Sequence, residues 1–266
     1  MHEDENRRVY ERRAVGARYA GRSQLQPVEA EIFRRYRTEV AGARTLDLGV
    51  GAGRTTPFLF EMSSKYVGLD YSAEMVARCR ERFPSVDFDV ADARDLSRFE
   101  DASFDFVLFS YNGLDEMGHA DRLKVLKEIY RLLSPGGLFV FSSHNRDFPI
   151  PKPWDLHHLA VNPLSDPLGF SKRLVSYPVG MVNFLRRYYR VEEQDEYSVL
   201  VDVPYMYSLV HYHIRADAQA RQLQRAGFTD VEAFGADGRL IAVSNSNGVG
   251  DPWIHYACRR PERRAP

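Results

Sequence analysis

The sequence predicts an α/β fold in which helices cover both faces of a doubly wound, mostly parallel sheet of seven strands. Short apolar segments alternate with segments of helical periodicity from residue 44 to residue 142, and this alternation is typical of parallel sheets. A glycine-rich turn joins the first apolar segment to the helix that follows it. Near the carboxyl end, Thr229–Ala233 and Trp253–Cys258 are expected to pair, which makes the last strand antiparallel.

The composition fits one large domain with a packed core. The chain has 266 residues, of which 44% are hydrophobic and 12% aromatic, so there is enough apolar material for such a core. Lysine and arginine number 36 against 37 aspartates and glutamates, which gives a formal charge of -1. A chain with so little net charge has no general attraction for nucleic acid or anionic lipid, and we predict neither as a partner.

The cysteines and the N-terminus favour a cytoplasmic protein. Cys79 and Cys258 lie far apart in the sequence, so we expect buried, reduced thiols rather than a disulfide framework or a zinc site. Residues 1–22 are crowded with charge and lack the apolar segment of a secretory signal. No apolar stretch approaches membrane-spanning length.

The expected elements follow one another in chain order. Residues 1–36 form a charged helical arm that is broken near Gly21–Pro27. Ser72 is expected to cap a helix that ends before Pro84. Five strands are predicted at residues 44–49, 66–70, 86–90, 104–110 and 138–142, with helices up to residue 63 and at 73–83, 121–133 and 216–226.

The alternation of strands and helices stops after residue 144. Residues 145–215 are rich in proline, aromatic residues and histidine, and we interpret them as an insertion after the fifth strand that forms an acceptor-binding lid. A contact surface in a homodimer is the alternative. The core domain then consists of residues 37–144 and 216–260.

The turn after the first strand carries the most informative motif. Gly49, Gly51 and Gly53 follow Asp47 closely, and glycines there allow positive φ angles and let a ligand lie against the backbone. A plain tight turn without a ligand is the alternative. A dinucleotide fingerprint needs glycine at the first, third and sixth positions, but Arg54 stands at the sixth, which disfavours a nicotinamide cofactor.

These residues resemble the first motif of the class I S-adenosylmethionine-dependent methyltransferases, which has an acidic residue two positions before a G-x-G-x-G turn. The resemblance covers residues 5–145 in order and, less closely, 216–258. It implies S-adenosyl-L-methionine as the cofactor, with its amino-acid part on the turn and with Asp47 and the three glycines in the binding site.

Further cofactor contacts are expected at the ends of the second and third strands. Asp70 follows the glycines by about 20 residues, where a carboxylate accepts hydrogen bonds from a ribose diol; its alternative role is to cap the next helix. Tyr71 and Met75 would flank the adenine. The resemblance assigns the adenine amino group to Asp92 and a ring nitrogen to the amide of Ala93.

The fourth strand and the N-terminal arm are expected to complete the site. In the family, the loop after the fourth strand borders cofactor and acceptor, which implies Ser110 and Tyr111 for the cofactor and Asn112 for the acceptor. The Asp/Asn-Pro-Pro-aromatic tetrapeptide of amino-methylating DNA enzymes is missing there, so methylation of nucleobases is disfavoured. Tyr10 and Tyr19 of the arm resemble segments that fold over the bound cofactor.

Histidine is the residue best suited to take a proton from an acceptor near neutral pH. We choose His144 as the candidate base because it follows the fifth strand at the carboxyl edge of the sheet. A structural or surface role is the alternative for every histidine. His211 and His213 are spaced to share a strand face without a third ligand, so no metal is predicted. Tyr205, Tyr207 and His211 are predicted acceptor contacts.

The sequence therefore predicts transfer of a methyl group to oxygen or nitrogen of a small molecule such as a metabolite, natural product or sugar. Two alternatives remain open at this point. One is a cofactor-binding relative without catalysis, since methyl transfer needs few obligatory side chains. The other is a nicotinamide-dependent oxidoreductase, which the glycine spacing disfavours.

Overall fold

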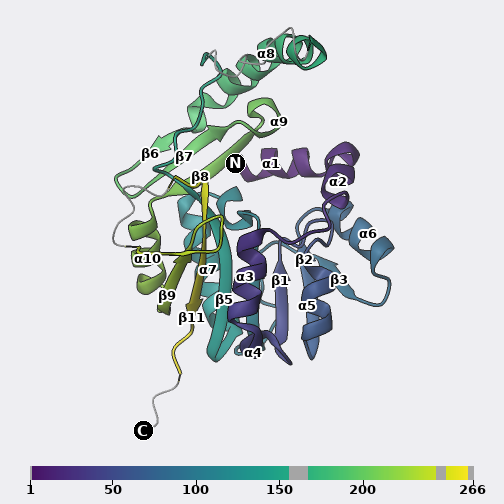
Figure 1. Cartoon of the computed structure of the whole chain (residues 1–266), viewed down its shortest axis with the longest axis vertical. Helices are drawn as coiled ribbons and strands as arrows, with labels where there is room; N and C mark the ends of the chain where they lie inside the picture. Colours follow the sequence, from purple (N-terminus) through teal and green to yellow (C-terminus); the bar gives the residue numbers. More distant parts are fainter. Residues whose placement is uncertain (1, 156–166, 244–249, 263–266) are drawn as a thin grey trace.

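One twisted sheet runs through the computed structural model and carries helices on both faces (Figure 1). The structure describes residues 2–155, 167–243 and 250–262. The main path of the sheet has the strand order β10-β9-β11-β5-β4-β1-β2-β3. The order reverses between β1 (Arg44–Leu48) and β4 (Phe104–Phe109), and in such sheets the crevice at that reversal is where ligands bind.

The strands at the centre of the sheet are parallel, as predicted. β1 pairs with β2 (Lys65–Asp70) on one side and with β4 on the other. β2 also pairs with β3 (Asp87–Val90), and β4 pairs with β5 (Leu133–Asn145). Because these strands run in one direction, their carboxyl ends and the loops that follow them meet at the same edge of the sheet.

Alternating residues of the central strands explain why both faces of the sheet are covered. In β4, Val107 and Phe109 belong to one buried cluster, whereas Phe106 and Leu108 belong to a second. Helices α7 (His119–Leu132) and α10 (Ala216–Arg225) pack on the first cluster. Helices α3 (Pro27–Arg35), α5 (Thr56–Met62) and α6 (Ala73–Arg82) pack on the second.

The carboxyl-terminal end of the sheet is antiparallel, as the sequence predicted. β11 (Trp253–Arg259) lies antiparallel between β5 and β9 (Thr229–Phe234). The two-residue β10 (Leu240–Ile241) borders β9. Cys79 and Cys258 are both buried and free, which agrees with the expectation of reduced thiols.

The described residues of the N-terminal arm form three helices with a break at residues 21–26. Besides α3 these are α1 (His2–Tyr10) and α2 (Arg13–Ala20), and the short α4 (Arg37–Val40) follows the arm. Val9 and Val15 pack into a small buried cluster with Ala52 of the glycine-rich turn and Met75 of α6. The first two helices therefore rest over the carboxyl edge of the sheet, next to the glycine-rich turn.

Residues 145–215 add strands to the same sheet as well as a protruding helix (Figure 1). The described elements of this segment are α8 (Pro167–Arg187), η3 (Tyr188–Arg190), β6 (Glu192–Glu193), β7 (Tyr197–Asp202), α9 (Pro204–Tyr207) and β8 (Leu209–Ile214). β8 pairs with the end of β5 and with β7. With β6, β7, β8 and β10 included, the sheet has eleven strands in the described residues instead of the seven of the core pattern.

Two histidines of the sequence, His157 and His158, lie outside the described residues. Among the helices within the described ranges, none combines the length and the hydropathy that crossing a lipid bilayer requires.

Candidate functional site

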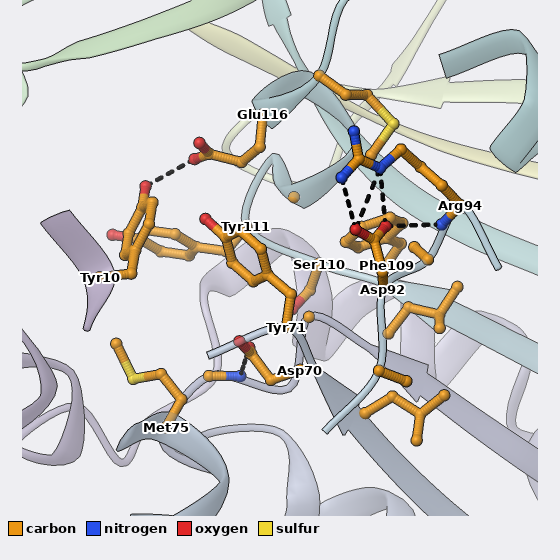
Figure 2. Close-up of a pocket in the computed structure, with 18 of the residues that line it drawn as sticks. Tyr10, Asp70, Tyr71, Met75, Asp92, Arg94, Phe109, Ser110, Tyr111 and Glu116 are labelled. Atoms are coloured by element: carbon orange, nitrogen blue, oxygen red, sulfur yellow. Dashed lines mark hydrogen bonds and ion pairs between the residues drawn. The ribbon is translucent and has the colours of Figure 1, made fainter. Parts of the chain in front are cut away.

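A pocket of about 850 Å³, part of it open to solvent, lies at the carboxyl edge of the central strands. Figure 2 shows that its wall combines tyrosines of the N-terminal arm with residues from the ends of β2, β3 and β4. Eleven of the predicted cofactor contacts line it: Tyr10, Tyr19, Gly49, Gly51, Asp70, Tyr71, Met75, Asp92, Ala93, Ser110 and Tyr111.

The glycine-rich turn forms the floor of the pocket. Gly49, Gly51 and Gly53 have φ angles of 61°, 56° and 78°, a region that residues with a side chain rarely adopt. A Cβ on Gly53 would lie 2.7 Å from the Phe83 ring, so this glycine serves the packing behind the turn. A Cβ on Gly51 would meet only the Tyr19 ring, at 3.8 Å, so Gly51 leaves its backbone open toward the pocket.

Asp47 lies beneath the turn and is fully buried. Its Oδ2 accepts hydrogen bonds from the hydroxyls of Thr55 at 2.7 Å and Tyr66 at 2.8 Å. Burial raises the pKa of Asp47 to about 6 although these hydroxyls act against the shift. Asp47 and Gly53 are not among the lining residues of the pocket; Asp47 lies beneath the turn and Gly53 is part of it.

Asp70 places a buried carboxylate in the pocket wall. Its Oδ2 accepts from the amide of Gly51 at 2.9 Å, and its Oδ1 accepts from the amide of Ser72 at 2.8 Å. Burial raises the pKa of Asp70 to about 6, and the two amide donors limit the rise. Each oxygen keeps a lone pair for a further donor, which suits a carboxylate that binds a diol.

Four tyrosines form an aromatic wall above the turn. The ring of Tyr10 lies 6.0 Å from that of Tyr19 and 6.3 Å from that of Tyr71. Tyr19 in turn lies 6.0 Å from Tyr111. The hydroxyl of Tyr71 is buried without a hydrogen-bond partner among the described residues. A buried unpaired hydroxyl is costly unless a ligand or water satisfies it, so this wall is suited to a partly polar ligand.

Asp92 is in the expected place but has an unexpected partner. Its carboxylate accepts hydrogen bonds from both Nε and Nη2 of Arg94, the latter at 2.6 Å (Figure 2). Although burial acts in the opposite direction, Arg94 lowers the pKa of Asp92. Arg94 also lines the pocket. A ligand amino group that approaches Asp92 would therefore share its carboxylate with this guanidinium.

Glu116 is a pocket residue that the sequence reasoning missed. It ends η1 (Gly113–Glu116), the short helical turn that follows the loop after β4. Its carboxylate accepts from the hydroxyl of Tyr10 at 2.6 Å and from the amide of Asn6 at 2.6 Å. Its Oε1 also lies 3.2 Å from Nε2 of His211. No sequence spacing signals this residue, because its partners come from the arm and from β8.

The loop after β4 turns sharply through two left-handed residues. Tyr111 and Asn112 have φ angles of 56° and 60°, which is uncommon for residues other than glycine. The amide of Asn112 donates to Ser142 Oγ at 2.8 Å. This hydrogen bond helps to hold the turn, which sets Tyr111 in the pocket wall and brings the Asn112 side chain to His144.

His144 is held by a buried ion-pair network. Its Nδ1 lies 2.8 Å from Asp115 Oδ2, and its backbone amide donates to the same oxygen at 2.6 Å. Asp115 also pairs with Arg122, and both side chains are fully buried. Although burial acts in the opposite direction, Arg122 and His144 lower the pKa of Asp115. This fixed carboxylate holds the imidazole with Nε2 facing away from it, 3.3 Å from the Asn112 amide.

A second histidine and a second carboxylate lie against His144. The ring of His211 stacks on that of His144 at 4.7 Å, and its Nδ1 lies 2.8 Å from Asp202 Oδ2. Burial by itself lowers the pKa of His211, but Glu116 and Asp202 together raise it to about 10. His213, by contrast, is buried without a hydrogen-bond partner in the described residues, and burial lowers its pKa to about 3.

The predicted acceptor contacts lie around the pocket rather than in its wall. The ring of Tyr205 meets that of Tyr10 at 6.5 Å. Tyr207 packs on Phe184 at 5.8 Å, and its hydroxyl donates to the carbonyl of Pro151 at 3.1 Å. Four predicted residues are not among the lining residues of the pocket: Asn112, Tyr205, Tyr207 and His211.

The residues present fit an adenosyl cofactor on three structural grounds. The turn leaves its backbone open at Gly51. The Asp70 carboxylate stands at the end of β2, and the Tyr71 hydroxyl has no hydrogen-bond partner in the part of the chain that the structure describes. Together they offer a backbone surface, a diol acceptor and a further polar contact around one pocket.

Comparison with known proteins agrees with this assignment. Residues 45–137 match the family model described as a methyltransferase domain. The chain is 30% identical over 115 residues to a probable S-adenosylmethionine-dependent methyltransferase of Mycolicibacterium smegmatis, covering 43% of each protein. It is 30% identical over 127 residues to a ubiquinone biosynthesis O-methyltransferase of Xanthomonas oryzae pv. oryzae, covering 46% of this chain and 51% of that one. The chain thus spans about half the length of the curated relatives it matches.

A solved structure extends the likeness of the fold beyond the matched domain. The 1,6-didemethyltoxoflavin-N1-methyltransferase of Burkholderia thailandensis, with bound 1,6-didemethyltoxoflavin and S-adenosylhomocysteine, superposes with a TM-score of 0.53 at 15% identity. The superposition covers 89% of this chain and 79% of that one. Residues 45–137 therefore match a methyltransferase domain, and the chain as a whole shares the fold of a solved S-adenosylhomocysteine-bound methyltransferase.

Proposed function

We propose that the protein transfers a methyl group from S-adenosylmethionine to oxygen or nitrogen of a small-molecule acceptor. The observation that carries the proposal is the pocket at the reversal of the strand order, where Asp70 and the open backbone of Gly51 meet. Asp70 and Gly51 both belong to residues 45–137, the segment that matches the methyltransferase family model.

The residues of the pocket divide the binding task among them. Asp70 would accept both ribose hydroxyls, and the Gly49–Gly53 turn would carry the amino-acid part of the cofactor. Met75 and Tyr71 would contact the adenine, with Asp92 and the amide of Ala93 at its edge. The tyrosines of the arm, Tyr10 and Tyr19, would cover the bound cofactor and exclude water.

The acceptor side of the proposal rests on the N-terminal arm and residues 145–215. The arm and this segment meet where Tyr10 contacts Tyr205 and where α1 packs on β8, so we propose that residues 145–215 form a lid over the acceptor. Relatives that act in ubiquinone biosynthesis or on 1,6-didemethyltoxoflavin, as their names state, favour a small acceptor. A largely aromatic surround would suit a flat, partly apolar molecule.

The chemistry requires alignment more than acid or base strength. The sulfonium of the cofactor supplies an electrophilic methyl group, so the protein mainly has to hold the acceptor atom in line with it. For a hydroxyl or a protonated amine, a base must also take a proton. We propose His144 for this role, because Asp115 holds its Nδ1 and leaves Nε2 as the lone-pair nitrogen.

Calorimetric titration tests the cofactor assignment. Wild-type protein is titrated with S-adenosylmethionine, S-adenosylhomocysteine and NAD, alongside Asp70→Ala and the control Asp101→Ala, a surface aspartate paired with Arg131. Asp70→Ala should weaken the binding of both adenosyl ligands by about 100-fold or more, because each hydrogen bond to a charged group contributes about 1.5–3 kcal/mol. Binding of NAD in place of the adenosyl ligands would contradict the assignment.

Turnover is a separate question with its own assay. Release of S-adenosylhomocysteine is measured with a panel of phenols, hydroxylated heterocycles and amines, using His144→Gln as the matched variant. Turnover of at least one acceptor, reduced in His144→Gln without loss of cofactor affinity, is the expected result. Cofactor binding with no turnover on any acceptor would favour a binding protein without catalysis.

A further inference from the structure

Two shielded carboxylates beside the pocket have no lysine or arginine as a partner in the described part of the chain. The side chain of Asp202 is 12% exposed and that of Glu116 is 17% exposed. The basic groups that face them are imidazoles: His144 and His211 for Asp202, and His211 for Glu116. Carboxylates so poorly hydrated are stable only near positive charge. Either a proton or a metal ion must supply that charge.

Another carboxylate lies at the far nitrogen of each imidazole. His144 Nδ1 lies 2.8 Å from Asp115 Oδ2, and His211 Nε2 lies 3.2 Å from Glu116 Oε1. His211 donates from Nδ1 to Asp202 Oδ2 in this structure, so a metal at Nδ1 would replace that proton and leave the other one on Nε2, beside Glu116. Histidines that bind metals are usually oriented in this way, by a carboxylate or carbonyl at the second nitrogen.

The two remaining nitrogens converge on one oxygen. His144 Nε2 lies 3.6 Å and His211 Nδ1 lies 2.8 Å from Oδ2 of Asp202. The three donor atoms all lie within 4.8 Å of one another. Two ligands on a tetrahedral zinc ion with bonds of about 2.1 Å lie about 3.4 Å apart, so the side chains would need to close by up to roughly 1.4 Å through changes of their torsion angles.

Asn112 is an independent indication of a ligand at this place. The residue is 8% exposed, and its Oδ1 has no hydrogen-bond partner among the described residues. Its Nδ2 lies 3.3 Å from His144 Nε2, so the amide group borders the cluster. If the amide turns over, its carbonyl oxygen faces the cluster and becomes a fourth donor.

We propose that His144, His211 and Asp202 bind a divalent first-row transition metal, with the carbonyl of Asn112 as a fourth ligand. Two imidazoles and one carboxylate suit zinc or iron, whereas magnesium and calcium prefer sites made of oxygen alone. The site adjoins the cofactor pocket, since Glu116 both lines the pocket and contacts His211.

The sequence analysis predicted no metal because His211 and His213 have no third ligand near them in the sequence. The fold supplies the other ligands. β8 pairs with β7, which brings Asp202 beside His211, and it pairs with β5, which brings His144 beside the same strand. His213, although next but one to His211, is not part of the donor set.

Metal binding and general-base action would use the same lone pair on His144. A metal-loaded protein would therefore use His144 as a ligand, and only the metal-free protein could use it as the base proposed above. The test is a titration of metal in the absence of cofactor, so its outcome does not depend on whether methyl transfer occurs.

Chelator-treated full-length protein is titrated with Zn²⁺ by calorimetry, and separately with Mg²⁺. The variants are Asp202→Asn and His211→Gln, and the matched controls are His213→Gln on the same strand and His255→Gln on β11, both buried histidines. Binding of Co²⁺ to the wild type is followed by visible absorption, which distinguishes protein ligands from water. Circular dichroism verifies that each variant is folded.

The expected result is one Zn²⁺ per wild-type chain, an intense Co²⁺ spectrum and no comparable binding of Mg²⁺. Asp202→Asn and His211→Gln each remove a direct ligand. Each should therefore weaken Zn²⁺ binding more strongly than the loss of a residue that only supports a ligand, which typically costs about 10- to 100-fold in affinity. The control variants should bind as the wild type does. Failure of the wild type to bind Zn²⁺ or Co²⁺, or unchanged binding in folded Asp202→Asn, would overturn the proposal.

Discussion

Acidification should weaken the binding of S-adenosylhomocysteine through the titration of Asp70. Burial raises the pKa of this carboxyl to about 6, so the group changes its charge within an accessible pH range. Its ionised form can accept hydrogen bonds from both ribose hydroxyls, whereas the protonated form has a hydroxyl of its own that competes as a donor. Affinity should therefore be highest above the pKa and should fall below it.

The expected size of the effect follows from this pKa. If only the ionised carboxylate binds the diol, half of the protein is competent at about pH 6 and roughly one part in ten at about pH 5. The dissociation constant should then increase about tenfold between about pH 7 and about pH 5, or about 1.4 kcal/mol. Above about pH 7 it should be constant.

Two variants separate Asp70 from other groups that titrate in the same range. Asp70→Asn carries no titrating group and should bind weakly with little dependence on pH. Asp47→Asn removes the other carboxyl whose pKa lies at about 6 but leaves the pocket wall unchanged, so it should keep the tenfold change. Calorimetry at each pH gives the dissociation constants. A wild-type affinity that is flat with pH, or an equal slope in Asp70→Asn, would refute the reasoning.

Three further predictions concern the stability of the site. Asp47→Asn should raise the free energy of unfolding by up to about 3 kcal/mol at pH 7.5 but by only about 1 kcal/mol at pH 4.5. The folded-state pKa of about 6 exceeds the unfolded value, so the stabilisation from protonation is complete only below the unfolded pKa and is lost as pH rises through about 6. Urea denaturation at both pH values measures the change, and a smaller gain at pH 7.5 than at pH 4.5 would contradict the sign. Gly51→Ala should lower the free energy of unfolding by only about 1–2 kcal/mol, because of its left-handed backbone, but should weaken cofactor binding at least about tenfold. Gly53→Ala, whose methyl group would meet the Phe83 ring, should mainly lower the melting temperature. The reverse pattern would contradict the assigned geometry. Arg122→Ala should lower the free energy of unfolding by about 3–5 kcal/mol, because it leaves Asp115 charged and buried without its partner. A decrease of less than about 1 kcal/mol in urea denaturation would show that the pair is not buried as described.

Local sequence signals predicted the part of the site that is built from consecutive residues. Gly49 and Gly51 had to be glycines because the turn uses positive φ angles, and Asp70 had to follow the second strand because parallel strands end at one edge. The serine cap at Ser72, whose Oγ accepts from the amide of Met75, was likewise visible as a local pattern. These features depend on contacts within a few residues or on one strand pairing.

The remaining part of the site depends on contacts between distant segments. Glu116 joins the site through Tyr10 and His211, which lie more than 90 residues away on either side. The pairing of Arg94 with the Asp92 carboxylate is an exception, because these residues are only two positions apart. Asp202 meets His144 only after β8 has paired with both β5 and β7. Without those pairings, the sequence offers isolated polar residues with no preferred partners.

The most direct test of the account is a crystal structure of the protein with S-adenosylhomocysteine. The account predicts that the ligand lies in the pocket with both ribose hydroxyls within hydrogen-bond distance of the Asp70 carboxylate and with its amino-acid part along the Gly49–Gly53 turn. A ligand bound outside this pocket, or in it with the ribose away from Asp70, would contradict the assigned site.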